Sequence, residues 1–334
     1  MARKPRVRYP GLFTFKPSGL GARPETSRQI LQCCPDSLLF KLQPFVKSSG
    51  MKLCRFLNQN QIRIGLWNEG GMISDLGAAG VTQLTPLLER EDLVAHLHSL
   101  AAQQLPEVSP SEVRLLPPVE RQEVWAVGVT YLRSKKARME ESDFSATAYD
   151  KVYDAPRPEL FFKSMPEKVV GPGDAVGIRS DAKWNVPEPE LALVLNSRGQ
   201  VVGYTVGNDM SSRDIEGENL LYLPQAKIYD RACAVGPCIV VGESAEAARG
   251  WTIAVQISRG GQAVFSGQTS VSQIKRTFTE MAEYLFRSQT FPNGAVLLTG
   301  TGVVPGDDFT LNAGDVVRIE ISGIGVLENS VMVV

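Results

Sequence analysis

The sequence predicts a β-rich fold of the mixed α+β class. Apolar or alternating segments of strand length recur along most of the chain, whereas only two stretches have the three- and four-residue spacing of apolar side chains that indicates a helix. Strands and helices do not alternate, which argues against a doubly wound parallel sheet. The chain also lacks the glycine patterns of dinucleotide- and phosphate-binding loops, so nucleotide binding is not expected.

The first fifty residues differ from the rest in charge. Residues 1–50 carry nine basic and two acidic side chains, a charge of +7. Because the whole chain has a net charge of −1, the other 284 residues carry −8, which does not suit nonspecific binding to nucleic acid. We interpret residues 1–50 as a weakly ordered basic extension. A nucleic-acid-binding arm and a transit-like peptide are the alternatives.

A small N-terminal α/β domain is expected at residues 51–118. Residues 51–66 alternate in the manner of two short strands around the polar turn Asn58-Gln59-Asn60-Gln61. Residues 84–105 have helical spacing and end before Pro106. Pro117-Pro118 cannot continue a helix and is a natural boundary. We therefore expect a second domain at residues 119–334.

Strands are expected to dominate the second domain. Two hairpins are predicted, one at residues 190–195 and 201–207 and one at residues 252–258 and 263–267, the latter turning through Gly260-Gly261. One helix fits residues 271–287. The remaining strands are expected at residues 124–129, 160–163, 295–298, 316–321 and 331–334.

Histidine and cysteine usage limits the chemistry. His96 and His98 are the only histidines, which excludes a three-histidine zinc centre, and a Ser-His-Asp triad would have to use one of them. Five cysteines, an odd number without framework spacing, indicate free thiols in a reducing cytoplasm. No apolar run approaches the roughly 18 residues of a membrane-spanning helix. A cytoplasmic protein without a nucleic-acid or membrane partner is expected.

Acidic residues open the most apolar strand. Glu188 and Glu190 flank Pro189 and point to the same face of that strand, because strand side chains alternate. Two carboxylates at a buried strand end repel each other unless a positive charge lies between them. Asp209 ends the neighbouring hairpin strand and can return to the same place. Three carboxylates suit Mg²⁺ first and Mn²⁺ or Ca²⁺ next. The alternatives are solvated glutamates at a strand start and a turn-capping aspartate.

The second domain, from about residue 121 to residue 334, resembles the fumarylacetoacetate hydrolase superfamily. The matching stretches, which follow the family's order, are Glu188-Pro189-Glu190-Leu191-Ala192, residues 203–209, Lys227 in Gln225-Ala226-Lys227, Gly236-Pro237, and residues 298–302, 314–317 and 323–329. The resemblance implies a β-roll-like core of the α+β kind and a homodimer. It also implies Mg²⁺ held by Glu188, Glu190 and Asp209, with Lys227 beside the metal and the substrate.

One departure from the family pattern concerns the reaction. Hydrolases of the family carry an Asn-Tyr-x-x-His-x-x-Glu motif, whose histidine and glutamate activate water. Here Ser134 takes the histidine position and Ala137 the glutamate position. This stretch and residues 157–163 resemble the sugar-acid branch, which includes pentonate dehydratases. Elimination of water needs a base and an acid but no attacking water. We therefore expect a dehydratase acting on a small 2-keto-3-deoxy-sugar acid.

The remaining site residues are assigned by role. Lys227 is a candidate to place the substrate carboxylate or to act as base, and its alternative is an ion pair that holds Glu190 or Asp209. Glu159 and Glu141 are candidate catalytic acids, together with Glu140. Were residues 134–149 helical, Ser134, Arg138 and Glu141 would form one stripe over the substrate. Thr301 is expected to contact the substrate carboxylate, unless it only forms a glycine turn.

Two other functions stay open. A hydrolase that cleaves a carbon–carbon bond in a diketo acid with an unusual base is the first. A binding protein that keeps the metal ligands without catalysis is the second. The reaction product separates the dehydratase from the hydrolase.

Overall fold

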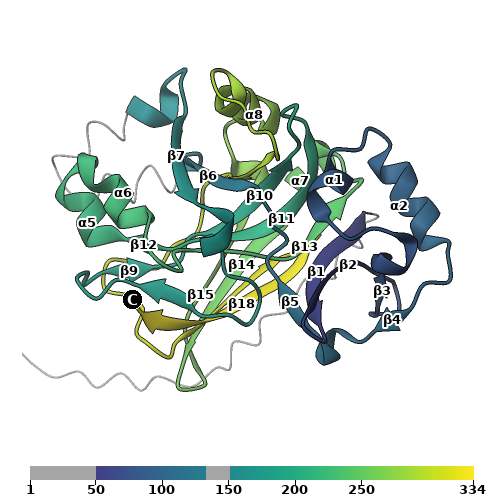
Figure 1. The fold of residues 1–334 in the computed structure, drawn as a ribbon. Helices are drawn as coiled ribbons and strands as arrows, with labels where there is room; N and C mark the ends of the chain where they lie inside the picture. Colours follow the sequence, from purple (N-terminus) through teal and green to yellow (C-terminus); the bar gives the residue numbers. More distant parts are fainter. Residues whose placement is uncertain (1–49, 133–150) are drawn as a thin grey trace, which may run out of the picture. The chain divides into compact units, whose positions relative to one another are not determined.

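Three β-sheets form most of the computed structural model, which describes residues 50–132 and 151–334 (Figure 1). Most strand neighbours pair antiparallel, which together with the short helices confirms the β-rich α+β class. The largest sheet holds, in spatial order, β4 (Glu107–Val108), β3 (Ile73–Asp75), β2 (Gln61–Trp67), β1 (Met51–Asn58), β13 (Cys233–Val241), β11 (Val201–Asp209), β10 (Pro189–Leu195), β16 (Ala295–Leu298), β6 (Glu123–Gly128) and β7 (Glu159–Ser164), with β5 (Arg114–Leu116) beside β1.

A second sheet packs on the first, and short helices surround both. It holds β15 (Gln262–Ser270), β14 (Thr252–Arg259), β17 (Val316–Ile321), β18 (Gly325–Val333) and β8 (Val176–Ile178), and β12 (Ser211–Ser212) pairs separately with β9 (Asn185–Val186). The α-helices that lie entirely within the described ranges are α1 (Leu84–Leu88), α2 (Leu93–Ala101), α5 (Arg213–Glu218), α6 (Leu223–Lys227), α7 (Ala245–Arg249) and α8 (Phe278–Phe286). None of them is long and apolar enough to cross a membrane.

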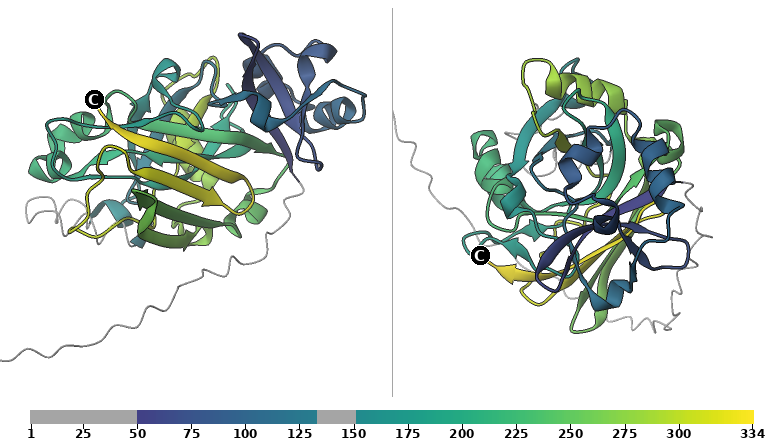
Figure 2. Two further views of the ribbon diagram at one scale, coloured as in Figure 1. Left: turned by 90° about the horizontal axis from the view of Figure 1, so that it is seen from below. Right: turned by 45° about the vertical axis from the view of Figure 1, so that its right-hand side comes forward.

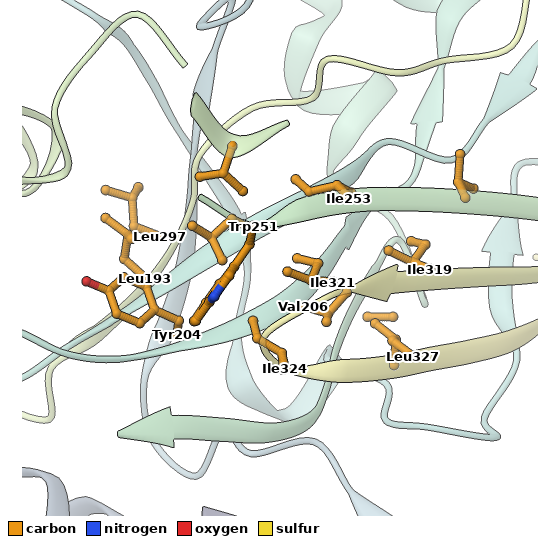
Figure 3. Packing of buried hydrophobic residues seen from close by; sticks show 14 of the residues in the cluster. Leu193, Tyr204, Val206, Trp251, Ile253, Leu297, Ile319, Ile321, Ile324 and Leu327 are labelled. Atoms are coloured by element: carbon orange, nitrogen blue, oxygen red, sulfur yellow. The ribbon is translucent and has the colours of Figure 1, made fainter. Parts of the chain in front are cut away.

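The core explains why β10 is apolar along its whole length. All seven residues of β10 are buried, because both of its faces are covered. Leu191 and Leu193 face the core shared with the five-stranded sheet, and Ala192 faces a second cluster with Leu298. In the shared core, Tyr204 of β11 meets Trp251 edge to face, with ring centroids 5.6 Å apart (Figure 3). Such pairs add roughly 1 kcal/mol to the effect of burial.

The N-terminal hairpin continues the large sheet. β1 pairs antiparallel with β2, as predicted, and Asn58 with Gln61 is the last pair before the turn. On its other side, β1 pairs with β13. Figure 2 shows β1 and β2, in purple and blue, with α1 and α2 at one end of this sheet. The domain boundary at residues 118 and 119 stays a prediction, as does the extension at residues 1–50, of which 1–49 lie outside the described residues.

The structure corrects several predicted elements. The helix expected at 84–105 is two helices, α1 and α2, which the polar run Glu89-Arg90-Glu91-Asp92 separates. The Glu89 carboxylate accepts hydrogen bonds from Ser197 N and Oγ, which fixes the break. The helix expected at 271–287 begins only at Phe278, after Thr277 caps it by accepting from Glu280 N. The strand expected at 331–334 is the end of the longer β18.

Candidate active site and metal centre

The β10–β11 hairpin brings three carboxylates together. Antiparallel pairing places the beginning of β10 beside the end of β11, and Asp209 N donates to Glu188 O at 3.0 Å. Glu188, Glu190 and Asp209 are all at least 97% buried. One carboxylate oxygen from each lies within 4.8 Å of the others. The geometry therefore gathers the three residues that the sequence proposes as metal ligands.

Three buried cations face these carboxylates. Lys227 Nζ donates to Glu188 Oε2 at 2.8 Å, to Asp209 Oδ2 at 2.9 Å and to Ser211 Oγ at 2.6 Å. Lys163 Nζ lies 2.5 Å from Asp209 Oδ1. Arg213 Nη2 donates to Glu188 Oε1 at 2.7 Å. Buried charges require such partners, because their desolvation would otherwise cost roughly several kcal/mol per ion.

Glu190 has a different partner. Its Oε2 accepts a hydrogen bond from Gly300 N at 2.6 Å, a main-chain donor. Burial and the neighbouring carboxylates of Asp209 and Glu188 raise the pKa of Glu190 well above its usual range. Gly300 can make this contact because its φ is +90°, a conformation that glycine adopts without strain. The charged form of Glu190 is therefore disfavoured in this cluster, and a bound cation would favour it.

A hollow opens over the carboxylates. Its cavity volume is about 10 Å³, which is close to the room that one water molecule or one ion needs. Strands β6, β7, β10 and β11, the end of α6 and the loop after β16 contribute its walls. Its lining consists of Val127, Gly128, Val129, Phe161, Glu188, Glu190, Asp209, Lys227, Gly300 and Thr301.

Glu159 lies at the edge of the hollow. It begins β7 opposite Gly128 of β6, and its carboxylate occupies the space in which a Cβ of residue 128 would stand. Only glycine at position 128 leaves this room. Gly128 lines the hollow, so the Glu159 carboxylate stands directly behind one residue of its wall, although Glu159 is not itself among the described residues that line the hollow.

Thr301 lines the hollow, as the sequence suggests, but its hydroxyl has a partner in its own loop. Thr301 Oγ1 donates to Val303 O at 3.0 Å and accepts from Val303 N at 3.4 Å. This is the geometry of a hydroxyl-supported turn. The predicted contact between Thr301 and a substrate carboxylate stays a prediction. Ser134, Arg138 and Glu141 lie outside the described residues, as does Glu140.

Sequence reasoning missed four functional neighbours. Lys163, Ser211 and Arg213 complete the hydrogen bonds of the carboxylates, and Gly128 makes room for Glu159. A signal exists for Lys163, because a lysine that follows the apolar run Leu160-Phe161-Phe162 in a strand must find partners when it is buried. For Ser211, Arg213 and Gly128, the spacing of residues in the sequence gives no such signal.

Comparisons with known proteins identify a family and several relatives. Residues 123–332 match the family model described as fumarylacetoacetate (FAA) hydrolase C-terminal. The chain is 52% identical over 217 residues to a probable 2-keto-3-deoxyxylonate dehydratase of Haloferax volcanii, a match that covers 65% of this chain and 74% of the relative. It is 43% identical over 220 residues, with the same coverage, to a 2-dehydro-3-deoxy-D-arabinonate dehydratase of Saccharolobus solfataricus.

A solved structure extends the similarity. A 2-keto-3-deoxy-D-arabinonate dehydratase complexed with magnesium and 2,5-dioxopentanoate superposes with a TM-score of 0.73 and 34% identity, covering 85% of this chain and 99% of that chain. More distant relatives include a human mitochondrial oxaloacetate tautomerase, 29% identical over 315 residues, which covers 86% of this chain and 94% of the relative.

Proposed function

The chain belongs to the fumarylacetoacetate hydrolase family, and on that premise we propose that it is a magnesium-dependent dehydratase. Its substrate is a 2-keto-3-deoxy-sugar acid of the pentonate type, and its product is a 2-keto acid semialdehyde. The dehydratase names of the relatives support this, and so does the 2,5-dioxopentanoate in the related structure, which is such a semialdehyde. The observation that carries the proposal is the cluster of three buried carboxylates beside Lys227.

The donor set fits a divalent cation of the hard, oxygen-binding kind. Glu188, Glu190 and Asp209 would hold it, and the raised pKa of Glu190 marks the place where positive charge is lacking. Such an ion supplies Lewis-acid chemistry, which makes the carbon-3 protons of a 2-keto acid more acidic. Mn²⁺ and Ca²⁺ prefer similar ligands, so their activities belong in the same assay.

Lys227 orients the carboxylates in this proposal. Its three protons are directed to Glu188, Asp209 and Ser211, which supports the ion-pair role over that of a base. The ammonium still lines the hollow and adds positive charge where the carboxylate of a keto acid would approach. A neutral amine in the same position has only two N–H donors, so it could not make all three of these hydrogen bonds.

Glu159 is our candidate for proton transfer. Its carboxylate rests against Gly128, which lines the hollow, and this position supports a role in taking a proton from carbon 3 of a keto acid. The same group can return that proton to the departing carbon-4 hydroxyl. Phe161, from the same strand, forms an apolar wall that excludes water from this exchange. Glu141 stays a second candidate acid, and Ser134 and Arg138 stay proposed substrate contacts.

The reaction balances with the loss of one water. The carbon-3 to hydrogen bond and the carbon-4 to oxygen bond break, and a double bond forms between carbons 3 and 4. Two keto–enol tautomerisations then move hydrogens from carbon 5 and its hydroxyl to carbons 4 and 3. The result is an aldehyde at carbon 5 and a restored 2-keto group. No attacking water takes part, in agreement with the serine at position 134.

We also propose that the enzyme is a cytoplasmic homodimer. The resemblance of the second domain to its family supports the dimer, and the free, buried thiols of Cys54, Cys233 and Cys238 suit a reducing compartment. Light scattering coupled to size exclusion tests the dimer, which a monomeric mass at micromolar concentration would refute.

A substrate panel tests the proposed reaction. The purified chain is incubated with 2-keto-3-deoxypentonates and with acylpyruvates, each with magnesium and with excess chelator. We expect the sugar acids alone to be consumed, and only with magnesium. Consumption of acylpyruvates alone would indicate the hydrolase instead. Magnesium binding without turnover of any keto acid would indicate a binding protein.

A further inference from the structure

A strand irregularity directs Lys163 toward the carboxylates. In the ladder between β6 and β7, Val124 pairs with Ser164 and Trp125 pairs with Phe162, so Lys163 is the extra residue. Such bulges re-aim a side chain and are frequent next to active sites. The Lys163 side chain is completely buried. The chain thus places a full positive charge in the interior at the one position of β7 that has no partner in the ladder.

The three protons of Lys163 are all used beneath the site. Nζ lies 2.5 Å from Asp209 Oδ1, and it donates to Met210 O at 2.9 Å and to Lys227 O at 2.5 Å. Lys227 borders the hollow, whereas Lys163 is not among the described residues that line it. Lys163 is therefore connected to the hollow through Asp209 and does not line the hollow itself.

The charges of the buried carboxylates and of their cationic partners balance. When ionised, Glu188, Glu190 and Asp209 carry three negative charges, and their partners Lys163, Lys227 and Arg213 carry three positive ones. The six side chains then sum to zero. A divalent cation leaves these six at +2, and the ionised Glu159 carboxylate beside Gly128 brings the total to +1, which suits an anionic keto acid. Because these groups are buried, their interactions are weakly screened, and each charge counts strongly.

We propose that Lys163 is a specificity-determining residue, which makes the loaded site attractive to an anion and in return weakens its affinity for the cation. The inference rests on the metal site of the proposed function. Without Lys163 the six-residue set would fall to five, with a charge of −1. A divalent cation would then bind more tightly, and the loaded site would attract an anion less.

Two variants and one control test this assignment. Lys163→Met removes the charge with little change in volume, and Lys163→Gln also removes it but keeps an amide donor for the two main-chain carbonyls. Lys168→Met is the matched control, because Lys168 pairs with Asp230 at 2.9 Å on the surface, four residues after β7 ends. Calorimetry measures the Kd of magnesium chloride, and then the Kd of pyruvate for the magnesium-saturated protein. Pyruvate is an anionic 2-keto acid without a leaving hydroxyl.

The expected shifts have opposite signs. In both Lys163 variants the magnesium Kd should fall and the pyruvate Kd should rise, each by at least about tenfold, whereas the control should stay within about twofold. Folded variants with unchanged affinities would make Lys163 purely structural, and weaker magnesium binding would make it a positioning residue; either result overturns the proposal. Wild-type protein that binds magnesium but converts no keto acid would refute the proposed reaction and leave this test intact.

Discussion

Gly128 of β6 and Glu159 of β7 face each other across one antiparallel ladder, and the Glu159 carboxylate fills the space that a side chain at position 128 would need. Gly128 also lines the hollow over Glu190 and Asp209. The absence of a Cβ at one residue therefore sets the position of the carboxylate that we propose for proton transfer.

Gly128→Ala should displace that carboxylate and slow the reaction. A misplacement of about 1 Å can cost on the order of 100-fold in rate, so we expect kcat to fall by about 10- to 100-fold while the magnesium Kd is unchanged. Gly250→Ala is the control, because its added methyl group would meet only Ala247 O at 3.2 Å. Steady-state kinetics at saturating magnesium gives the comparison. A Gly128→Ala enzyme with wild-type kcat would exclude Glu159 from proton transfer.

Glu190→Gln should remove magnesium-dependent activity without unfolding the protein. Loss of a partner that only orients a ligand weakens metal binding by about 10- to 100-fold, and loss of a ligand itself should cost more. Thermal stability should be kept or increased, because burial beside Asp209 and Glu188 already disfavours the charged form of Glu190. Magnesium titration and thermal unfolding measure the two effects. Retained activity in a folded variant would place the metal elsewhere.

The carboxylate pattern could be found in the sequence because its cause is local. Alternation puts Glu188 and Glu190 on one face, and a hairpin returns Asp209 to the same end. Lys163 and Arg213 could not be placed in this way, since their contacts join strands and a helix that only the folded chain brings together. Strand β13 was also not predicted. Its Gly236-Pro237 pair is typical of a turn, whereas here it lies inside a completely buried strand.

The helix predictions failed at their ends for physical reasons. Apolar spacing continues through residues 84–105, but α1 ends before Glu89, whose carboxylate accepts a hydrogen bond from Ser197 N. At the other helix, the side chain of Thr277 offers a better beginning than the apolar residues before it. A tertiary hydrogen bond sets the first of these helix boundaries and a side-chain cap sets the second. The periodicity of apolar residues contains no information about either interaction.

Folding stability should depend on pH through Asp315. Burial tends to raise its pKa, but hydrogen bonds from Arg259 and from Asn312 N outweigh this and hold the pKa below its usual 3.8. The ionised form is therefore favoured in the folded chain, so its stabilisation is present above the unfolded pKa and is lost as pH falls through the folded one. Asp315→Asn should lower the free energy of unfolding at pH 7 by roughly 1–3 kcal/mol. In urea unfolding this deficit should shrink near pH 3, and an equal deficit at both values would refute the ion-pair explanation.

The described cysteines should resist alkylation while the chain is folded. Burial raises the pKa of Cys233 and of Cys238 to about 12 and raises that of Cys54 as well, so almost no thiolate exists at pH 8. Iodoacetamide labelling followed by peptide mass spectrometry should find these three residues modified only after denaturation. Rapid modification of Cys233 in the native protein would show that the end of β13, where Cys233 pairs with Asp209, opens to solvent.

The most direct test of the central claim is the product formed in heavy water. With magnesium and a 2-keto-3-deoxypentonate, proton NMR should show a semialdehyde that has lost one water and carries deuterium at carbons 3 and 4. That result would establish enolisation followed by elimination. Pyruvate and a two-carbon fragment as the products would instead mean cleavage of the carbon–carbon bond, and would contradict the assignment of this chain as a dehydratase.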